Sequence, residues 1–188
     1  YTVERSELGE DKDKILSIQI PEKAGSFLKL SKRFSNSQIT EFNYRLSDPS
    51  DAHVLVGVKT KSAKNFISLK NKLSKNHYSF KDLTKNEISN DHLRHMVGGR
   101  SPTARTERVF RMEFPERPGA LLDFLEKLGN KWNITLFHYR NLGSAFGKVL
   151  VGIEDTSKNK ELLKRYLKRT GYTFTEETSN IAYKHFLE

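Results

Sequence analysis

The sequence contains no cysteine and no long hydrophobic run. The absence of cysteine among the 188 residues excludes disulfides, thiolate nucleophiles and every cysteine-ligated zinc or iron–sulfur site. No stretch approaches the roughly 20 consecutive apolar residues that a membrane-spanning helix needs, and the mean hydropathy is −0.67. The chain opens on Tyr1, without a basic-then-apolar leader. We therefore expect a soluble intracellular segment of a longer protein, with no membrane partner.

Blocks of like charge are also missing, although positive charge is in excess. The chain carries 33 Lys and Arg against 23 Asp and Glu, a net charge of +10. Residues 1–100 hold 18 basic and 12 acidic side chains, and residues 101–188 hold 15 and 11, so the excess is spread evenly. Because no run of five or six like charges occurs, we interpret the charge as a solvated surface and expect no nucleic-acid partner.

Catalytic motifs are absent as well. The sequence has no Gly-x-Ser-x-Gly elbow, no phosphate loop ending in Lys-Ser/Thr and no His-Glu-x-x-His pair. His92 and His95 are three residues apart, but no carboxylates accompany them, which favours surface histidines over metal ligands. We predict no catalytic residue, no metal site and no cofactor within these residues.

The main positive feature is a tandem repeat. The segment ILSIQIPEKAGSFL at 15–28 matches VFRMEFPERPGALL at 109–122, an offset of 94, as from Gly25 to Gly119. One inserted residue near Trp132 shifts the next matches to an offset of 95, and a later deletion restores 94. These later matches are 39–45 with 134–140, 54–58 with 149–153, and 78–80 with 172–174. Several blocks in the same order indicate a duplication.

Each copy shows the same succession of patterns. Short β-branched and aromatic runs predict strands, and apolar spacing of three to four residues after each glycine predicts helices. The expected strands are 15–20, 39–46, 53–59 and one centred on 78–80, then 109–114, 134–141, 147–153 and one centred on 172–174. The order βαββαβ occurs twice. It predicts an α+β fold of two ferredoxin-like domains, with antiparallel sheets and helices on one face.

The repeat also sets the expected domain boundaries. Residues 1–14 would lead in from a preceding domain, and residues 15–83 would form the first domain. A linker with a short helix is expected at 84–108. The second domain would cover 109–178, and a C-terminal helix 179–188.

The repeated glycine turn is one candidate binding feature. Pro-Glu-x-x-Gly joins a strand to a helix, and Gly25 and Gly119 permit a positive φ there. The amides that follow, at Ser26 and Ala120, begin a helix N-terminus that can hold a small anion such as an amino-acid carboxylate. A tight turn without a ligand is the alternative explanation.

The repeated Phe-x-Tyr-Arg motif is a second candidate. Phe42 and Tyr44, like Phe137 and Tyr139, share one strand face, whereas Arg45 and Arg140 point to the other. A tyrosine near a strand end can keep its hydroxyl at a pocket edge. Core packing explains the same pattern equally well.

Several of these segments carry a family resemblance. FPERPGALL at 114–122, WNITLFHYR at 132–140, HLRHMVGGR at 92–100, Glu177-Thr178 and ERSELGE at 4–10 closely resemble the regulatory part of biosynthetic threonine deaminase (threonine ammonia-lyase). The resemblance covers essentially the whole chain. It implies two ACT-like domains and a homotetrameric parent enzyme that converts threonine to 2-oxobutanoate and ammonia. It also implies feedback inhibition by isoleucine, relieved by valine. Pyridoxal phosphate would belong to a catalytic domain outside this chain.

The resemblance also assigns residues. It implies that Tyr44 and Tyr139 match the tyrosines of two effector sites, and that Arg100 and Arg140 match positions associated with feedback sensitivity, with Arg45 as the first-copy counterpart. The effector carboxylate would lie near the amides after Gly25 or Gly119, with a tyrosine closing each pocket. The copies differ at Ala24 for Pro118 and at Asn43 for His138, so their preferences need not agree.

Two alternatives remain open at this stage. An RNA-recognition domain has the same element order and stacks bases on aromatics of its first and third strands; Phe110, Phe114 and Phe146 approach that pattern in the second copy only. A stand-alone amino-acid sensor would bind the same ligands. We expect a cytoplasmic bacterial protein, and the resemblance leaves an organellar one open.

Overall fold

The computed structural model describes residues 14–46, 50–89, 101, 106–115, 117, 119–140 and 146–187. The first repeat comprises β1 (Lys14–Pro21), α1 (Ser26–Ser31), the 3-10 helix η2 (Lys32–Phe34), β2 (Gln38–Arg45), β3 (Asp51–Lys59), α2 (Ala63–Lys75) and β4 (Phe80–Asp82). The second comprises β5 (Glu107–Pro115), α4 (Ala120–Leu128), β6 (Asn133–Arg140), β7 (Phe146–Glu154), α5 (Glu161–Arg169) and β8 (Phe174–Glu176), followed by α6 (Ile181–Phe186). The expected βαββαβ order is confirmed in both copies.

The described strands form one sheet, which the sequence did not predict. Their order is β4-β1-β3-β2-β6-β7-β5-β8, so two four-stranded halves join through the antiparallel pair β2–β6. In this pair Phe42 lies opposite Tyr139, and Tyr44 lies opposite Phe137. The phenylalanine of each repeat thus lies opposite the tyrosine of the other, so a pseudo-twofold axis passes through the junction.

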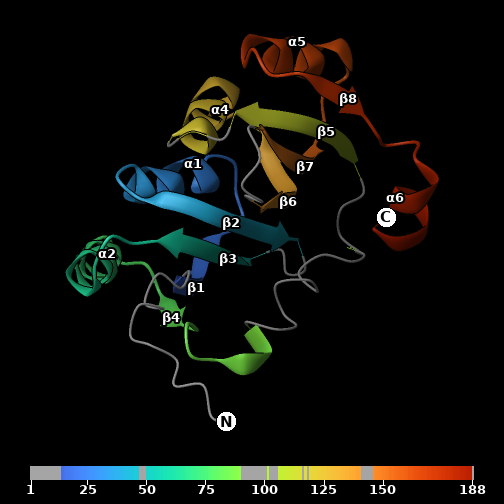
Figure 1. Cartoon of the computed structure of the whole chain (residues 1–188). Helices are drawn as coiled ribbons and strands as arrows, with labels where there is room; N and C mark the ends of the chain where they lie inside the picture. Colours follow the sequence, from blue (N-terminus) through green and yellow to red (C-terminus); the bar gives the residue numbers. More distant parts are fainter. Residues whose placement is uncertain are drawn as a thin grey trace.

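Helices α1, α2, α4 and α5 contribute to one core that runs through both repeats. Helices α1 and α4 lie side by side over the junction of the two halves (Figure 1). Helix α6 covers the opposite face, where Tyr183 packs against Val109 and Leu136. The helices of the two βαββαβ repeats therefore share one face, as expected, and α6, which follows the second repeat, lies on the other. No helix in the described ranges is long and apolar enough to cross a membrane.

The last strand of the first repeat begins later than expected. The expectation centred it on 78–80, whereas β4 starts at Phe80. The amide of Tyr78 instead donates to Leu73 O at 3.1 Å, and His77 has a left-handed φ of 60°, so this segment still ends helix α2. In the expected linker, residues 87–89 are helical, and residues 90–100 lie outside the described part.

Candidate functional site

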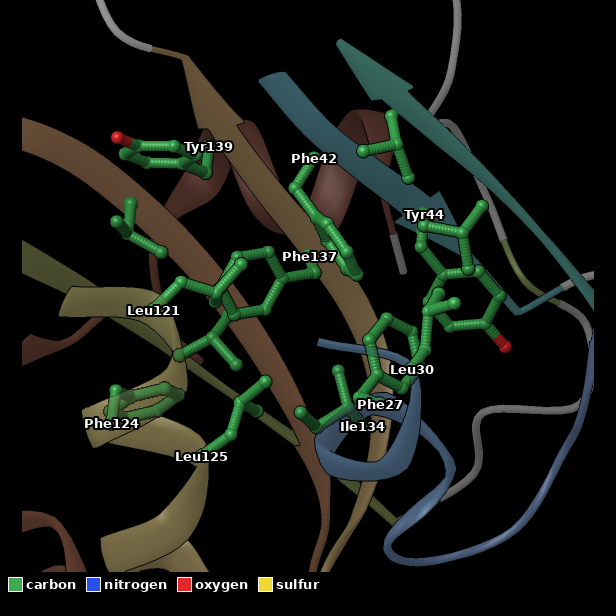
Figure 2. Close-up of a cluster of buried hydrophobic side chains, with 14 of the residues drawn as sticks. Phe27, Leu30, Phe42, Tyr44, Leu121, Phe124, Leu125, Ile134, Phe137 and Tyr139 are labelled. Atoms are coloured by element: carbon green, nitrogen blue, oxygen red, sulfur yellow. The ribbon is translucent and has the colours of Figure 1, made fainter. Parts of the chain in front are cut away.

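An aromatic cluster fills the junction between the two repeats (Figure 2). The rings of Phe42 and Phe137 meet edge to face with centroids 5.6 Å apart, and Phe27 packs 5.6 Å from Phe42. Phe42 and Phe137 are buried. They form core contacts between the repeats and line neither of the pockets described below, so the structure does not place them at the expected binding positions.

A cavity of about 50 Å³ opens beside this cluster, and we call it the Gly119 pocket. The second repeat contributes Arg117, Gly119, Ala120, Leu121, Leu122 and Tyr139. The first repeat contributes Ser31, Phe34, Ser35, Ser37, Gln38 and Ile39. The structure thus brings together three of the expected site residues, Gly119, Ala120 and Tyr139, and completes the walls with residues from the other repeat.

The Gly119 pocket has a polar end and an apolar wall. Gly119 has a φ of 84° and begins helix α4, which no side chain caps within the described part of the chain. The first amides of a helix lack intrahelical acceptors and favour negative charge. Arg117 adds a cation to this end, with Nη2 3.8 Å from Asp123 Oδ2. Leu121 and Ile39 are apolar wall residues.

Asp123 is held ionised at this end of the pocket. The hydroxyl of Tyr172 donates to Asp123 Oδ2 at 2.6 Å, and Lys127 Nζ lies 3.1 Å from the same oxygen. These contacts, the tyrosine above all, lower the pKa of the Asp123 carboxyl from its ordinary 3.8. Burial and the same hydrogen bond raise the pKa of Tyr172 to about 12. Asp123 is therefore already paired.

A second, smaller cavity is related to the first by the repeat, and we call it the Gly25 pocket. Its volume is about 10 Å³, near the roughly 10–15 Å³ that one water molecule requires. The first repeat contributes Lys23, Gly25, Phe27 and Leu28, which correspond through the offset of 94 to Arg117, Gly119, Leu121 and Leu122. The second repeat contributes Leu125, Leu128, Gly129, Trp132 and Ile134. Each pocket is thus built from both repeats.

The two tyrosines of the motif lie in different surroundings. Tyr139 lines the Gly119 pocket, but Tyr44 does not line the Gly25 pocket. The Tyr44 hydroxyl donates to Glu22 instead, and Glu22 also accepts from Asn133 Nδ2 at 3.0 Å. Burial raises the pKa of both Tyr44 and Glu22. Figure 2 shows the two tyrosine hydroxyls at opposite ends of the aromatic cluster.

The remaining expected residues lie away from the pockets. Ser26 is buried and lines neither pocket. Arg45 lies on the opposite sheet face, with Nη1 2.5 Å from Glu107 Oε2, and its Nη2 donates to Leu187 O. Arg140 is paired with Glu41 in the β2–β6 ladder. Arg100 lies outside the described residues.

Sequence reasoning missed the buried cluster around Glu107. Its carboxylate accepts from Arg45, from the Thr135 hydroxyl and, at 2.8 Å, from the Tyr183 hydroxyl. The cluster therefore joins β2 of the first repeat to β5, β6 and α6 of the second. The available signal was an acidic residue two positions before a strand expected at 109, which by itself does not indicate burial.

The described residues do not fit pyridoxal phosphate or a metal ion. A Schiff-base lysine must lie in a cavity that also holds its cofactor; Lys23 lines the Gly25 pocket, but that cavity of about 10 Å³ has no room for one. These ranges also contain no group of three or more His, Asp or Glu arranged to hold a metal.

An RNA-stacking face is not present on the strands considered earlier. Phe110 and Phe114 are fully buried in the helix-covered core, so neither can stack on a base. Phe146 is 59% exposed, but within the described part no other exposed aromatic residue lies on the first and third strands of its repeat. The structure therefore argues against the RNA-recognition alternative.

These features define a class of protein, a fused pair of ferredoxin-like repeats that share one sheet, one core and two pockets at their junction. The sequence matches the family described as the C-terminal regulatory domain of threonine dehydratase in two successive stretches, residues 4–93 and 98–187. The chain belongs to this family, and the two matched stretches correspond to the two repeats.

Relatives that match this chain over its whole length agree with this assignment. The chain is 42% identical to L-threonine dehydratase biosynthetic IlvA of Escherichia coli K12 over 188 residues, which are all of this chain and 36% of that protein. It is 41% identical to the Burkholderia multivorans protein of the same name, covering 37% of it. It is 36% identical to the mitochondrial threonine dehydratase of Saccharomyces cerevisiae, covering 34% of it. The chain thus spans little more than a third of the length of these relatives.

Proposed function

We propose that this chain is the effector-sensing part of a threonine dehydratase, and that it binds isoleucine and valine in the Gly119 pocket. The observation that carries the proposal is the pocket itself, which combines a cationic end with an aliphatic wall between the two repeats. A free branched-chain amino acid has the same two parts. Membership of the regulatory-domain family supports the choice of ligand.

The pocket suggests an orientation for the ligand. The α-carboxylate would lie at the amides that begin α4, near the Arg117 guanidinium. The branched side chain would pack against Ile39 and Leu121. Tyr139, at the end of β6, would close the pocket on its remaining side.

Pocket contacts alone do not explain how isoleucine and valine would have opposite effects on the enzyme. The two ligands differ by one methylene, which a hydrophobic pocket distinguishes by about 1–3 kcal/mol. Feedback inhibition and its relief therefore need two arrangements of the protein with different affinities, because equal affinity shifts no equilibrium. Since both repeats form the walls, a ligand in this pocket would favour one placement of the repeats over another. Such coupling is usually about 1–3 kcal/mol.

The rest of the proposed function lies outside these residues. A catalytic part would hold pyridoxal phosphate and convert threonine to 2-oxobutanoate and ammonia, in a homotetramer. This chain would act on it by the placement of its repeats. The proposal includes no catalytic step by residues of this chain.

Isothermal titration calorimetry with isoleucine, valine and threonine tests the proposal. The native chain should bind isoleucine and valine, and Ser37→Phe should weaken isoleucine binding at least tenfold by filling the cavity that Ser37 lines. The control Ser74→Phe makes the same change at an exposed residue of α2 and should bind as the native chain does. Native affinity in Ser37→Phe would refute the pocket, and no heat with any of the three ligands would refute the function.

A further inference from the structure

Charged side chains are distributed differently over the helices of the two repeats. Residues 23–37 and 60–77 of the first repeat, which include α1, η2 and α2, contain nine Lys and Arg and no Asp or Glu. Their counterparts through the offset of 94, residues 117–131 and 154–171, contain nine Lys and Arg and five Asp and Glu. The two halves of the sequence have similar net charges, but the helices of the first repeat carry positive charge only.

An open groove lies where α2 packs beside η2, and we call it the Arg33 groove. Its volume is about 440 Å³, within the roughly 300–1,000 Å³ typical of small-molecule sites. Three basic side chains line it, those of Arg33, Lys64 and Lys72. The rest of its lining consists of asparagine carboxamides, serine hydroxyls and one leucine. No acidic and no aromatic residue of the described part lines this groove.

The three cations of the Arg33 groove have no carboxylate partner. Within the described residues they make no ion pair, whereas the nearby Lys70 pairs with Asp82 at 3.1 Å. Arg33 Nε is buried and has no hydrogen-bond partner in the same part of the chain. Burial raises the pKa of the Tyr78 hydroxyl, and the adjacent Arg33 guanidinium partly offsets this rise. Because that hydroxyl is neutral, it leaves the positive charge of Arg33 uncompensated.

The second repeat has apolar and aromatic side chains at equivalent positions. Through the offset of 94, Lys72 corresponds to Tyr166 and Ser68 to Leu162. Leu162 and Tyr166 pack against the core, and the Tyr166 ring meets that of Trp132 edge to face, with centroids 5.7 Å apart. Since the fold accepts core packing at these positions, the polar and cationic lining of the first repeat favours a ligand over a structural role.

We propose that the Arg33 groove binds a small molecule that carries phosphate groups and no aromatic base. Arginine and lysine bind phosphate oxygens strongly, and a cleft lined by one sign of charge raises the local concentration of such an anion. Bases of single-stranded nucleic acids bind by stacking on aromatic rings, which the described lining lacks. Lys64 is exposed and Lys72 partly exposed, so the groove does not enclose a lysine as a Schiff-base cofactor requires.

The Arg33 groove shares a wall with the Gly119 pocket. Ser37 lines both. Arg33 and Asn36 line the groove, and Phe34 and Ser35 of the same short segment line the Gly119 pocket. An anion that fixes this segment would therefore also fix one wall of the pocket. This consequence rests on the function proposed above: the bound anion should change the affinity for isoleucine about 5- to 150-fold, and isoleucine should change the affinity for the anion by the same factor.

Isothermal titration calorimetry of the 188-residue chain with pyrophosphate tests the groove, at about 0.15 M salt so that distant surface charges are screened. The control Lys75→Gln removes one charge from an exposed position of α2 outside the described lining. The native chain and this control should bind pyrophosphate alike. Lys72→Gln should bind it about tenfold more weakly, because it removes a charged hydrogen-bond donor from the groove. Thermal unfolding of each form without ligand checks that the fold is intact.

Several results would overturn the phosphate site. Absence of heat with the native chain would do so, and so would equal weakening in Lys75→Gln, because the anion would then bind to the basic surface as a whole. Citrate is a polyanion without phosphate, and equal affinity for citrate would refute the choice of phosphate. AMP that binds more tightly than inorganic phosphate would refute the exclusion of a base.

Titration of isoleucine with and without saturating pyrophosphate tests the coupling. Equal isoleucine affinities in the two titrations would refute the coupling, whereas pyrophosphate binding would still establish the site. Failure of isoleucine to bind in either titration would instead refute the proposed function, and the result with pyrophosphate would remain independent of it.

Discussion

Substituting alanine at Gly25 and at Gly119 should destabilise the chain unequally. Each glycine has a φ near 85°, at 85° and 84°, so each alanine should cost about 1–2 kcal/mol for the left-handed backbone alone. At Gly25 the new Cβ also lies 2.6 Å from Asn130 Oδ1. Relief requires the Asn130 side chain to leave its rotamer, which costs about 0.5–1.5 kcal/mol more. We therefore expect Gly25→Ala to be the more destabilising substitution by about 1 kcal/mol.

Urea unfolding measures this difference directly. The chain has a single tryptophan, Trp132, which is 4% exposed and gives one fluorescence probe for every variant. With unchanged m-values, the shift in midpoint reports the change in stability. In an Asn130→Ala background the extra destabilisation should disappear. Gly25→Ala should then lower the free energy of unfolding by the same amount as Gly119→Ala does in the native chain. Equal costs for the two single substitutions, or an excess that persists without the Asn130 carboxamide, would show that Asn130 does not cover Gly25.

Two charged clusters give further predictions. Glu107→Gln leaves the buried Arg45 guanidinium without its carboxylate and should lower the free energy of unfolding by about 3–5 kcal/mol. The control Glu113→Gln, at an exposed position, should change the free energy of unfolding little. Equal urea midpoints for the two variants would contradict the burial of the Arg45–Glu107 pair. Arg108 holds the pKa of Glu176 below 4.5 through a two-point ion pair. Because a lowered carboxyl pKa stabilises the fold above the unfolded-state pKa, the advantage of the native chain over Arg108→Lys should be full at pH 7 and should shrink as the pH falls through the lowered folded-state pKa. Arg108 also pairs with Asp155 and lowers its pKa, so the decline should follow both carboxylates; an advantage that does not shrink at all in acid would contradict these pairings.

Much of the fold could be predicted because its signals are local. Alternating apolar residues, proline at the strand ends and the glycine turn defined the βαββαβ order and most strand positions of each copy. The joining of the halves could not be predicted in this way. The Phe42–Tyr44 segment reads as a strand whether or not another strand pairs with it, and its pairing with Phe137–Tyr139 depends on the relative placement of two distant segments.

Only part of the candidate site could be predicted from the sequence. Gly119, Ala120 and Tyr139 do line one cavity, as the repeated motifs suggested. The same motifs assigned Tyr44 an equivalent role, but its hydroxyl donates to Glu22, which the alignment of the copies does not reveal. Likewise, the backbone at Gly129 (φ 74°, ψ −163°) departs from the helical angles of its counterpart Ser35, whereas the sequence shows only a glycine in place of a serine.

The most direct test of the account is a crystal structure of this chain grown with isoleucine. We expect one amino acid in the Gly119 pocket, with its carboxylate near Arg117 and the first amides of α4, and its side chain against Ile39 and Leu121. An empty Gly119 pocket, or isoleucine bound only at another surface, would contradict the central claim.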